Sequence, residues 1–151
     1  MHELLLFRHA DAEAHSSRVS DFQRPLSDIG RAAAQSAARR LARMPWQPQR
    51  LLYSPAQRTA ETAAILAAAL ELDGKRLQAL PALYLATPDT LRAELKDHHG
   101  EAQRLLIVGH NPGLSEFGAR LAARYAGQML PTAAYWHITL DAADWQQRVL
   151  S

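Results

Sequence analysis

The stretch LLLFRHA, residues 4–10, decides the fold of this chain. Four apolar residues run directly into an arginine and a histidine. This pattern predicts a buried strand that places both side chains at the carboxyl edge of a sheet, where open α/β folds bind their ligands. The stretch LLIVGHNPG, residues 105–113, repeats the pattern, and LLYSP, residues 51–55, leads to Arg58. Three strand ends therefore bring together two histidines and two arginines, which are residue types that attack and hold a phosphoryl group.

Length and composition predict one folded domain that covers residues 1–151. A hydrophobic fraction of 48% is ordinary for a globular protein and argues against disorder. The chain has no cysteine, so disulfides, thiolate chemistry and cysteine-based zinc sites are excluded, which fits a reducing cytoplasm. No run approaches the roughly 18 apolar residues that a membrane span needs, and the N-terminus has no basic leader. We therefore expect a cytoplasmic protein with no membrane partner.

The charge pattern does not indicate a nucleic-acid partner. The formal net charge is only +2. Arginines are spread along helical stretches, as they are on solvated helix faces, and no aromatic side chains are interleaved with them as in single-strand binders. We therefore expect no nucleic acid among the partners.

Strand-like runs alternate with helical patterns along the chain. The alternation predicts an α/β fold with three layers, α/β/α, and a mostly parallel sheet. A polar stretch, residues 11–24, is predicted to form a loop at the functional edge of that sheet. Residues 145–150 are expected to pair back on the last strand as a hairpin, so that the sheet has an antiparallel edge. The expected strands are residues 4–7, 50–53, 77–80, 104–108 and 134–140, and the expected helices are 28–44, 56–72, 88–97 and 112–125.

Two of the expected helices begin beside these strand ends. Ser54 is predicted to cap the helix that carries Arg58, and Asn111 is predicted to cap the helix that follows His110. A helix N-terminus exposes unpaired N–H groups and a partial positive charge. Both helix starts would therefore favour a bound anion.

Three motifs resemble those of the histidine phosphatase superfamily, which has the phosphoglycerate-mutase-like fold. They are Arg8-His9-Ala10 after the first strand, Arg58 at the start of the second helix, and GHNPG at residues 109–113. The short length and the segments DFQRPLS, residues 21–27, and LYLA, residues 83–86, are similar to the SixA-type phosphohistidine phosphatases. The resemblance covers essentially the whole chain, with the order and spacing of the motifs intact.

The resemblance implies a covalent phosphohistidine intermediate, with His9 as the nucleophile and with Arg8, Arg58 and His110 forming the phosphate pocket. The residue types fit this chemistry, because a neutral imidazole can attack phosphorus and guanidinium groups can grip phosphoryl oxygens bidentately. The arginines supply the charge that a divalent cation would otherwise bring, so no metal and no cofactor is expected. Three further residues are candidates for substrate binding: Asp21, Asn111 and Ser16.

The implied substrate is phosphohistidine on another protein, such as a phosphotransfer domain. A small phosphorylated molecule, cleaved as a phosphomonoester by the same His9 chemistry, is the alternative. A phosphate-binding adaptor without turnover is a third interpretation, which the intact set of histidines and arginines disfavours. The segment between Leu80 and Leu105 is too short for a large lid, and an open site suits a phosphorylated side chain on a protein surface.

The sequence departs from the superfamily pattern at two places. Ala10 stands where the superfamily normally has glycine, and a positive φ at that position would cost about 1 kcal/mol. Phosphomonoesterase members carry a glutamate as proton donor after the third strand, where this chain has PALY, residues 81–84. Asp21 is the leading candidate for a replacement acid, with Asp11 and Glu13 as alternatives.

Overall fold

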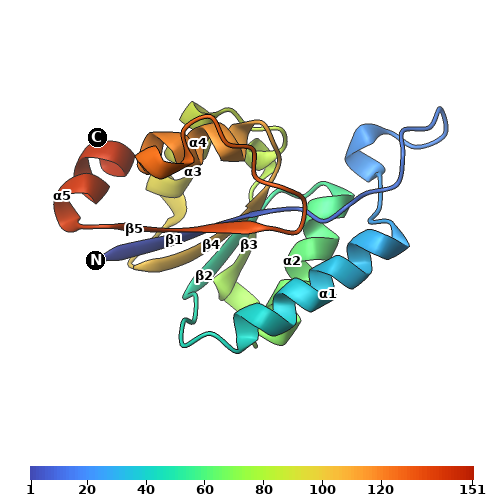
Figure 1. Cartoon of the computed structure of the whole chain (residues 1–151), viewed down its shortest axis with the longest axis horizontal. Helices are drawn as coiled ribbons and strands as arrows, with labels where there is room; N and C mark the ends of the chain where they lie inside the picture. Colours follow the sequence, from blue (N-terminus) through green and yellow to red (C-terminus); the bar gives the residue numbers. More distant parts are fainter.

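A five-stranded sheet forms the centre of the molecule in the computed structural model, which describes residues 1–151. The strand order is β3-β2-β4-β1-β5, and only β5 runs antiparallel to its neighbour. The expected α/β fold, with a mostly parallel sheet and an antiparallel edge, is confirmed (Figure 1). The strands are β1 (His2–Arg8), β2 (Arg50–Tyr53), β3 (Leu77–Ala79), β4 (Arg104–Gly109) and β5 (Tyr135–Leu140).

Helices cover both faces of the sheet, with α1 and α2 on one side and α3, α4 and α5 on the other (Figure 1). Successive side chains of a strand point to opposite faces, so β1 supplies both cores. Leu4 and Leu6 pack with the core under α3 and α4, whereas Leu5 and Phe7 pack with the core under α1 and α2. The helices are α1 (Asp28–Ala42), α2 (Gln57–Ala69), α3 (Pro88–His98), α4 (Gly113–Leu121) and α5 (Ala142–Trp145).

Side-chain caps fix the starts of α1 and α3. The Ser27 hydroxyl accepts a hydrogen bond from the Gly30 N–H at the start of α1, and the Thr87 hydroxyl accepts one from the Thr90 N–H in α3. The expected cap of α2 is wrong, because this helix begins after Ala56 without a side-chain cap, and Ser54 lies outside it. The helix α4 is shorter than expected and ends at Leu121, since Ala122 has extended backbone angles.

The C-terminal segment is a helix and not the second strand of a hairpin. Asp141 caps α5 by accepting a hydrogen bond from the Asp144 N–H at 2.8 Å, and a π-helical turn, Gln146–Leu150, continues the helix. Trp145 and Val149 lie one helical turn apart and both enter the core. The antiparallel edge is therefore supplied by β5 alone, which pairs with β1.

The parallel pairing of β1 with β4 sets the position of the functional edge. Arg8 lies opposite Gly109 in this pairing, so His9 and His110 leave the sheet side by side. The long connection from β1 to α1 extends beyond this edge of the sheet (Figure 1). No helix is long and apolar enough to cross a membrane.

Candidate active site

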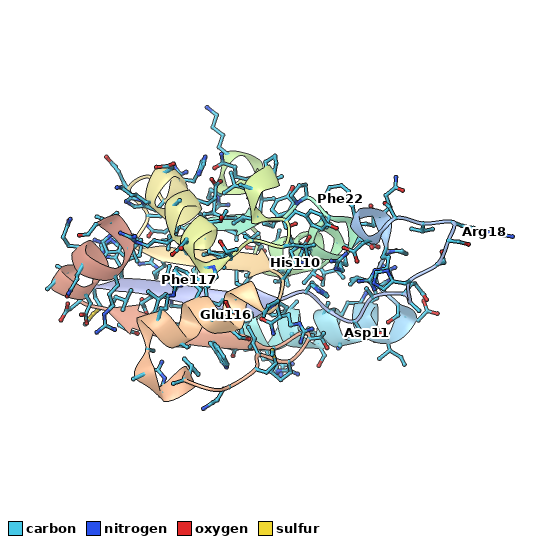
Figure 2. All side chains as sticks on the ribbon, turned by 90° about the horizontal axis from the view of Figure 1, so that it is seen from above. Asp11, Arg18, Phe22, His110, Glu116 and Phe117 are labelled. Atoms are coloured by element: carbon cyan, nitrogen blue, oxygen red, sulfur yellow. The ribbon has the colours of Figure 1, made fainter.

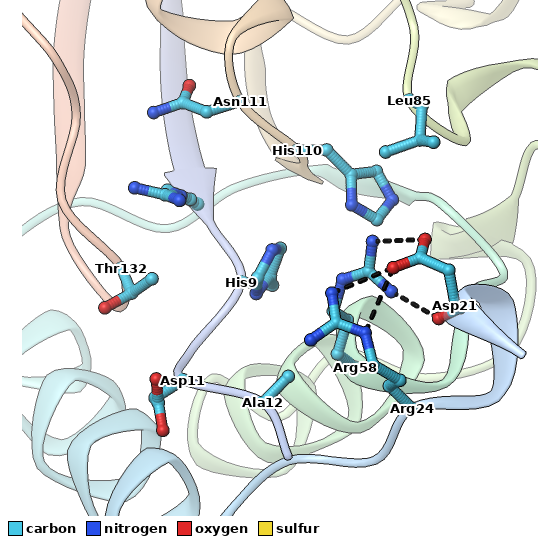
Figure 3. Close-up of a pocket in the computed structure, with 11 residues that line it drawn as sticks. His9, Asp11, Ala12, Asp21, Arg24, Arg58, Leu85, His110, Asn111 and Thr132 are labelled. Carbon is cyan, nitrogen blue, oxygen red and sulfur yellow. Dashed lines mark hydrogen bonds and ion pairs between the residues drawn. The ribbon is translucent and has the colours of Figure 1, made fainter. Parts of the chain in front are cut away.

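A pocket of about 360 Å³ lies at the carboxyl edge of the parallel strands. It brings together six of the seven site residues that the sequence predicts, namely Arg8, His9, Asp21, Arg58, His110 and Asn111 (Figure 3). The pocket is also lined by Asp11, Ala12, Arg24, Leu85 and Thr132. Three arginines and two aspartates thus face one small volume.

His9 is held in one ring orientation by the backbone that follows it. Its Nδ1 lies 2.7 Å from the carbonyl oxygen of Ala10. Because a carbonyl oxygen only accepts hydrogen bonds, Nδ1 carries the proton and Nε2 keeps a free lone pair. Burial lowers the pKa of His9 from 6.5 to about 4, and the nearby arginines lower it further against the opposing effect of the Ala10 hydrogen bond. The ring is therefore neutral near pH 7.

His110 lies next to His9, with a distance of 5.4 Å between the two ring centroids. Its Nε2 is 2.8 Å from the hydroxyl of the fully buried Ser54, which also accepts a hydrogen bond from the Ala56 N–H. The Ser54 proton has no other acceptor, so we infer that it goes to Nε2 and that Nδ1 of His110 is protonated. Burial, followed by the charge of Arg58, lowers the pKa of His110 to about 3.

One carbonyl group orients both Arg8 and Asn111. The oxygen of Leu130 accepts hydrogen bonds from Arg8 Nη1 at 3.1 Å and from Asn111 Nδ2 at 2.8 Å. The Asn111 Oδ1 in turn accepts hydrogen bonds from the backbone N–H and the hydroxyl of Ser115. The N-cap position of α4 is Pro112 and not the predicted Asn111, but the Asn111 side chain binds the first turn of α4 through Ser115 and links it to the segment before β5.

Asp21 binds two arginines and a tyrosine. Its Oδ1 accepts hydrogen bonds from Arg24 Nε at 3.0 Å and Nη2 at 2.9 Å, and its Oδ2 accepts one from Arg58 Nη2 at 3.1 Å. The backbone oxygen of Asp21 accepts a further hydrogen bond from Arg58 Nη1 at 2.7 Å. The Tyr84 hydroxyl donates to Oδ2 at 2.5 Å. The loop that carries Asp21 thereby holds the guanidinium of Arg58, whose side chain is almost fully buried (Figure 3).

These contacts argue against the expected role of Asp21 as a general acid. The hydrogen bond from Tyr84, followed by those from Arg24 and Arg58, holds the pKa of Asp21 far below its usual range, so the carboxylate is ionised. The same contact raises the pKa of Tyr84, which stays protonated. Of the alternatives, Asp11 lines the pocket and accepts a hydrogen bond from the Ser27 hydroxyl at 2.6 Å, and Glu13 does not line it.

Ser16 is not brought to the pocket. Its hydroxyl accepts hydrogen bonds from the backbone N–H groups of Arg18 and Val19, and these stabilise the exposed tip of the loop. Figure 2 shows Arg18 projecting at this tip, away from His110. Ala10 replaces the usual glycine without strain, because its φ is not positive, and its N–H donates a hydrogen bond to Thr62 Oγ1.

Sequence reasoning missed Arg24, Tyr84, Thr132 and the role of Ser54. Arg24 and Tyr84 stand in the two segments that support the resemblance, so a signal was present for both. Thr132 and Ser54 carry no such signal, because nothing in their sequence neighbourhoods separates them from ordinary turn residues. Only the fold shows that Thr132 lines the pocket and that Ser54 contacts His110 from behind it.

The pocket residues leave three buried polar atoms without a hydrogen-bond partner: Arg8 Nε, Arg58 Nε and His110 Nδ1. Native proteins satisfy most buried polar groups, so a group of unsatisfied donors in one place is typical of a functional site. The arrangement suits an anion with several acceptor oxygens. A phosphoryl group has this property.

Comparison with known families gives a match to the histidine phosphatase superfamily, branch 1, over residues 4–104. An uncharacterized chloroplastic protein of Arabidopsis thaliana is 32% identical over 129 residues, a match that covers 79% of this chain and 58% of that protein. The chain therefore spans less than two thirds of the Arabidopsis protein. An uncharacterized protein of Picosynechococcus sp. is 33% identical over 132 residues, with 85% of this chain and 78% of that protein covered.

Solved structures give closely similar folds. The protein histidine phosphatase SixA complexed with tungstate has a TM-score of 0.81 at 25% identity, with 94% of this chain and 90% of that chain covered. A provisionally named SixA phosphohistidine phosphatase from Agrobacterium tumefaciens has a TM-score of 0.78 at 26% identity, with 90% of both chains covered. The chain thus belongs to the histidine phosphatase superfamily, and its fold is closely similar to that of the SixA structures.

Proposed function

We propose that this phosphatase hydrolyses phosphohistidine on a protein through a covalent phosphoryl group on His9. The hydrogen bond from Nδ1 of His9 to the Ala10 carbonyl is the observation that carries this proposal, because it leaves Nε2 unprotonated beside three arginines. A neutral, oriented imidazole is a competent nucleophile near pH 7.

In the first step, the lone pair of His9 Nε2 attacks phosphorus, and the P–N bond of the substrate breaks. The electron pair of that bond returns to the substrate ring, which leaves as neutral imidazole because its second nitrogen already carries a proton. The phosphorylated ring of His9 is then cationic, and the Ala10 carbonyl oxygen stabilises the proton on Nδ1. Arg8, Arg58 and His110 would stabilise the negative charge on the phosphoryl oxygens.

In the second step, a water molecule attacks phosphorus and the bond to Nε2 breaks. The electron pair of that bond returns to His9, a proton of the water is released, and inorganic phosphate leaves the pocket. The charge stabilisation comes from the guanidinium groups in both steps. The proposed reaction therefore needs neither a metal nor a cofactor.

The state of Asp21 supports a P–N substrate over an alkyl ester. An alkoxide leaves poorly without a proton, and general acid catalysis contributes roughly 10² to 10⁴ in rate. The ionised Asp21 does not supply that proton. An imidazole needs no proton from the enzyme, so a pocket without a carboxylic acid at the leaving group favours phosphohistidine.

The experiment compares kcat/KM for a phosphohistidine peptide, phosphoramidate and a simple alkyl phosphate. We expect the two P–N substrates to be preferred by at least about a hundredfold. A kcat/KM for the alkyl phosphate equal to that for the peptide would favour the small-molecule phosphomonoesterase instead. Covalent labelling of His9 would exclude a binding adaptor without turnover. A cytoplasmic location stays a prediction.

A further inference from the structure

A second cavity, of about 380 Å³, lies beside the phosphate pocket. The two cavities share Leu85 and Asn111 as wall residues. The second cavity is also lined by residues 86–88, by Pro112, and by Gly113 and Glu116 in the first turn of α4. Because the cavities are adjacent, a substrate with its phosphoryl group beside His9 can extend past Leu85 into the second cavity.

The walls of this second cavity are fixed by close backbone packing. A Cβ atom on Gly113 would lie 1.9 Å from the carbonyl oxygen of Ala86, so only glycine allows α4 to approach the segment before α3. Leu85 has a φ of 50°, a conformation that costs a leucine about 1 kcal/mol or more. The surrounding contacts maintain this strain and present the Leu85 side chain, which is 53% exposed, between the two cavities.

The second cavity differs from the phosphate pocket in the sign of its charge. Glu116 is its only charged wall residue, is exposed, and makes no ion pair. Asp89, in the first turn of α3, is by contrast paired with Arg120 at 2.6 Å. A free carboxylate next to exposed Leu85 and two prolines fits a side chain with an apolar stem and a cationic end, since lysine and arginine bury their stems along apolar surface.

We propose that the second cavity binds a lysine or arginine side chain adjacent to the phosphorylated residue on the protein substrate. The proposal rests on the proposed function and adds to it a recognition rule. Arg8 and Arg58 of the first cavity hold the phosphoryl group, and Glu116 pairs with a cation next to it. Opposite charges in adjacent positions fix the orientation of the substrate and exclude partners with an acidic residue there.

Nine-residue peptides with a central phosphohistidine provide the test. In a series of such peptides, one lysine replaces alanine at each flanking position in turn, and a matched series carries norleucine or glutamate instead. For the wild-type enzyme at low salt, we expect at least one position at which lysine raises kcat/KM about fivefold or more over norleucine. The preference should weaken at high salt, because exposed charges are screened.

Variants at Glu116 test whether this residue makes the contact. Glu116→Gln should abolish the lysine preference, and Glu116→Lys should reverse it in favour of the glutamate peptides. Glu101→Lys is the matched control, because Glu101 is exposed in the turn before β4, at the end of that strand far from His110. This variant should leave the lysine preference unchanged. Phosphoramidate turnover should be the same in all four proteins, because this substrate has no side chain to bind.

The outcomes separate the two proposals. If the enzyme hydrolyses phosphoramidate and the peptides but shows no preference for lysine peptides, the basic subsite is disproved and the proposed function stays intact. The same holds if the lysine preference survives Glu116→Gln. Turnover of phosphoramidate with no hydrolysis of any peptide would contradict the protein substrate of the proposed function, and the subsite with it. Failure to hydrolyse phosphoramidate and all peptides would disprove the proposed function itself.

Discussion

The floor and the wall of the phosphate pocket are built in different ways. The floor consists of Arg8, His9, Arg58 and His110, which are anchored at the ends of buried strands or on α2. The wall consists of Asp21 and Arg24 on the long loop, together with Tyr84, and is held by hydrogen bonds between partly exposed side chains. The floor carries the groups that would react with phosphorus, and the wall acts on them through Arg58.

His9→Ala should have the largest effect on the floor. Without the nucleophile, we expect no turnover of phosphoramidate. We also expect no acid-labile, base-stable phosphoryl label on the protein when it is incubated with a phosphodonor and the reaction is then quenched. His98→Ala, at the end of α3, is the control and should behave as wild type. Label that persists in His9→Ala would identify another nucleophile, and His110 would be the first to test.

Arg8→Ala and Arg58→Ala should each lower kcat/KM by at least about a hundredfold. Each change removes a few kcal/mol of charge stabilisation from the transition state. Both variants should keep the far-UV circular dichroism spectrum of the wild type, and both should bind vanadate more weakly. Arg39→Ala, on the exposed face of α1, controls for the loss of one positive charge. Vanadate affinity equal to wild type in both pocket variants would remove these arginines from the site.

Asp21→Asn should have a smaller effect, a loss of about tenfold in kcat, or ~1.4 kcal/mol. The neutral amide no longer pairs with Arg58 and Arg24, so the guanidinium of Arg58 becomes less well positioned. A positioning residue affects P–N and alkyl substrates equally. If Asp21 were a general acid, the loss of kcat would be confined to the alkyl phosphate. That result would contradict the role of Asp21 in positioning Arg58. Tyr84→Phe, which removes one donor to Asp21, should show a weaker form of the same pattern.

The unfolding free energy should fall as the pH is lowered from about 6.5 towards 4. In the folded protein the pKa of His9 is about 4 and that of His110 about 3, both below the ordinary 6.5. Within this window the unfolded chain binds protons that the folded protein does not, so acid favours unfolding by up to roughly 3 kcal/mol for each histidine. Urea denaturation at several pH values measures this slope. His9→Gln should reduce it, and an unchanged slope in that variant would contradict the burial of a neutral His9.

Chelators should have the smallest effect on activity. The arginines of the floor supply the charge that a metal would otherwise provide. Turnover of phosphoramidate in excess EDTA should therefore equal turnover in buffer alone. Loss of activity in EDTA, with recovery on addition of a divalent cation, would contradict the metal-free reaction.

Sequence reasoning predicted the floor better than the wall, for a physical reason. A buried strand in the sequence gives a strong apolar signal, and its last residues must lie at the sheet edge, so the meeting of His9 and His110 follows from the pattern alone. The wall depends on how residues 11–24 fold back on Arg58 and Tyr84. A polar loop has no periodicity from which such contacts can be read, and the ionised state of Asp21 follows only from its partners.

The C-terminal error has a similar origin. Trp145 and Val149 are apolar positions four apart, which fits a helix as well as the edge of a hairpin. Asp141 followed by two alanines is the helix-start signal that would have decided between them, because the aspartate caps the first turn. Helix α4 ended early for a reason that its sequence does not show, since Ala122 has a high helix propensity and the extended backbone there is imposed by the fold.

Because Arg8 lies opposite Gly109, catalytic turnover depends on the correct alignment of β1 with β4. The two histidines are distant along the chain, and each is an ordinary imidazole until β1 and β4 align. A slip of one residue between these strands would send their side chains to the opposite faces of the sheet and separate the rings. A chain that is truncated before β4, or that collapses with its helices formed but its strands misaligned, would consequently be inert. We therefore expect no turnover before folding of the sheet is complete.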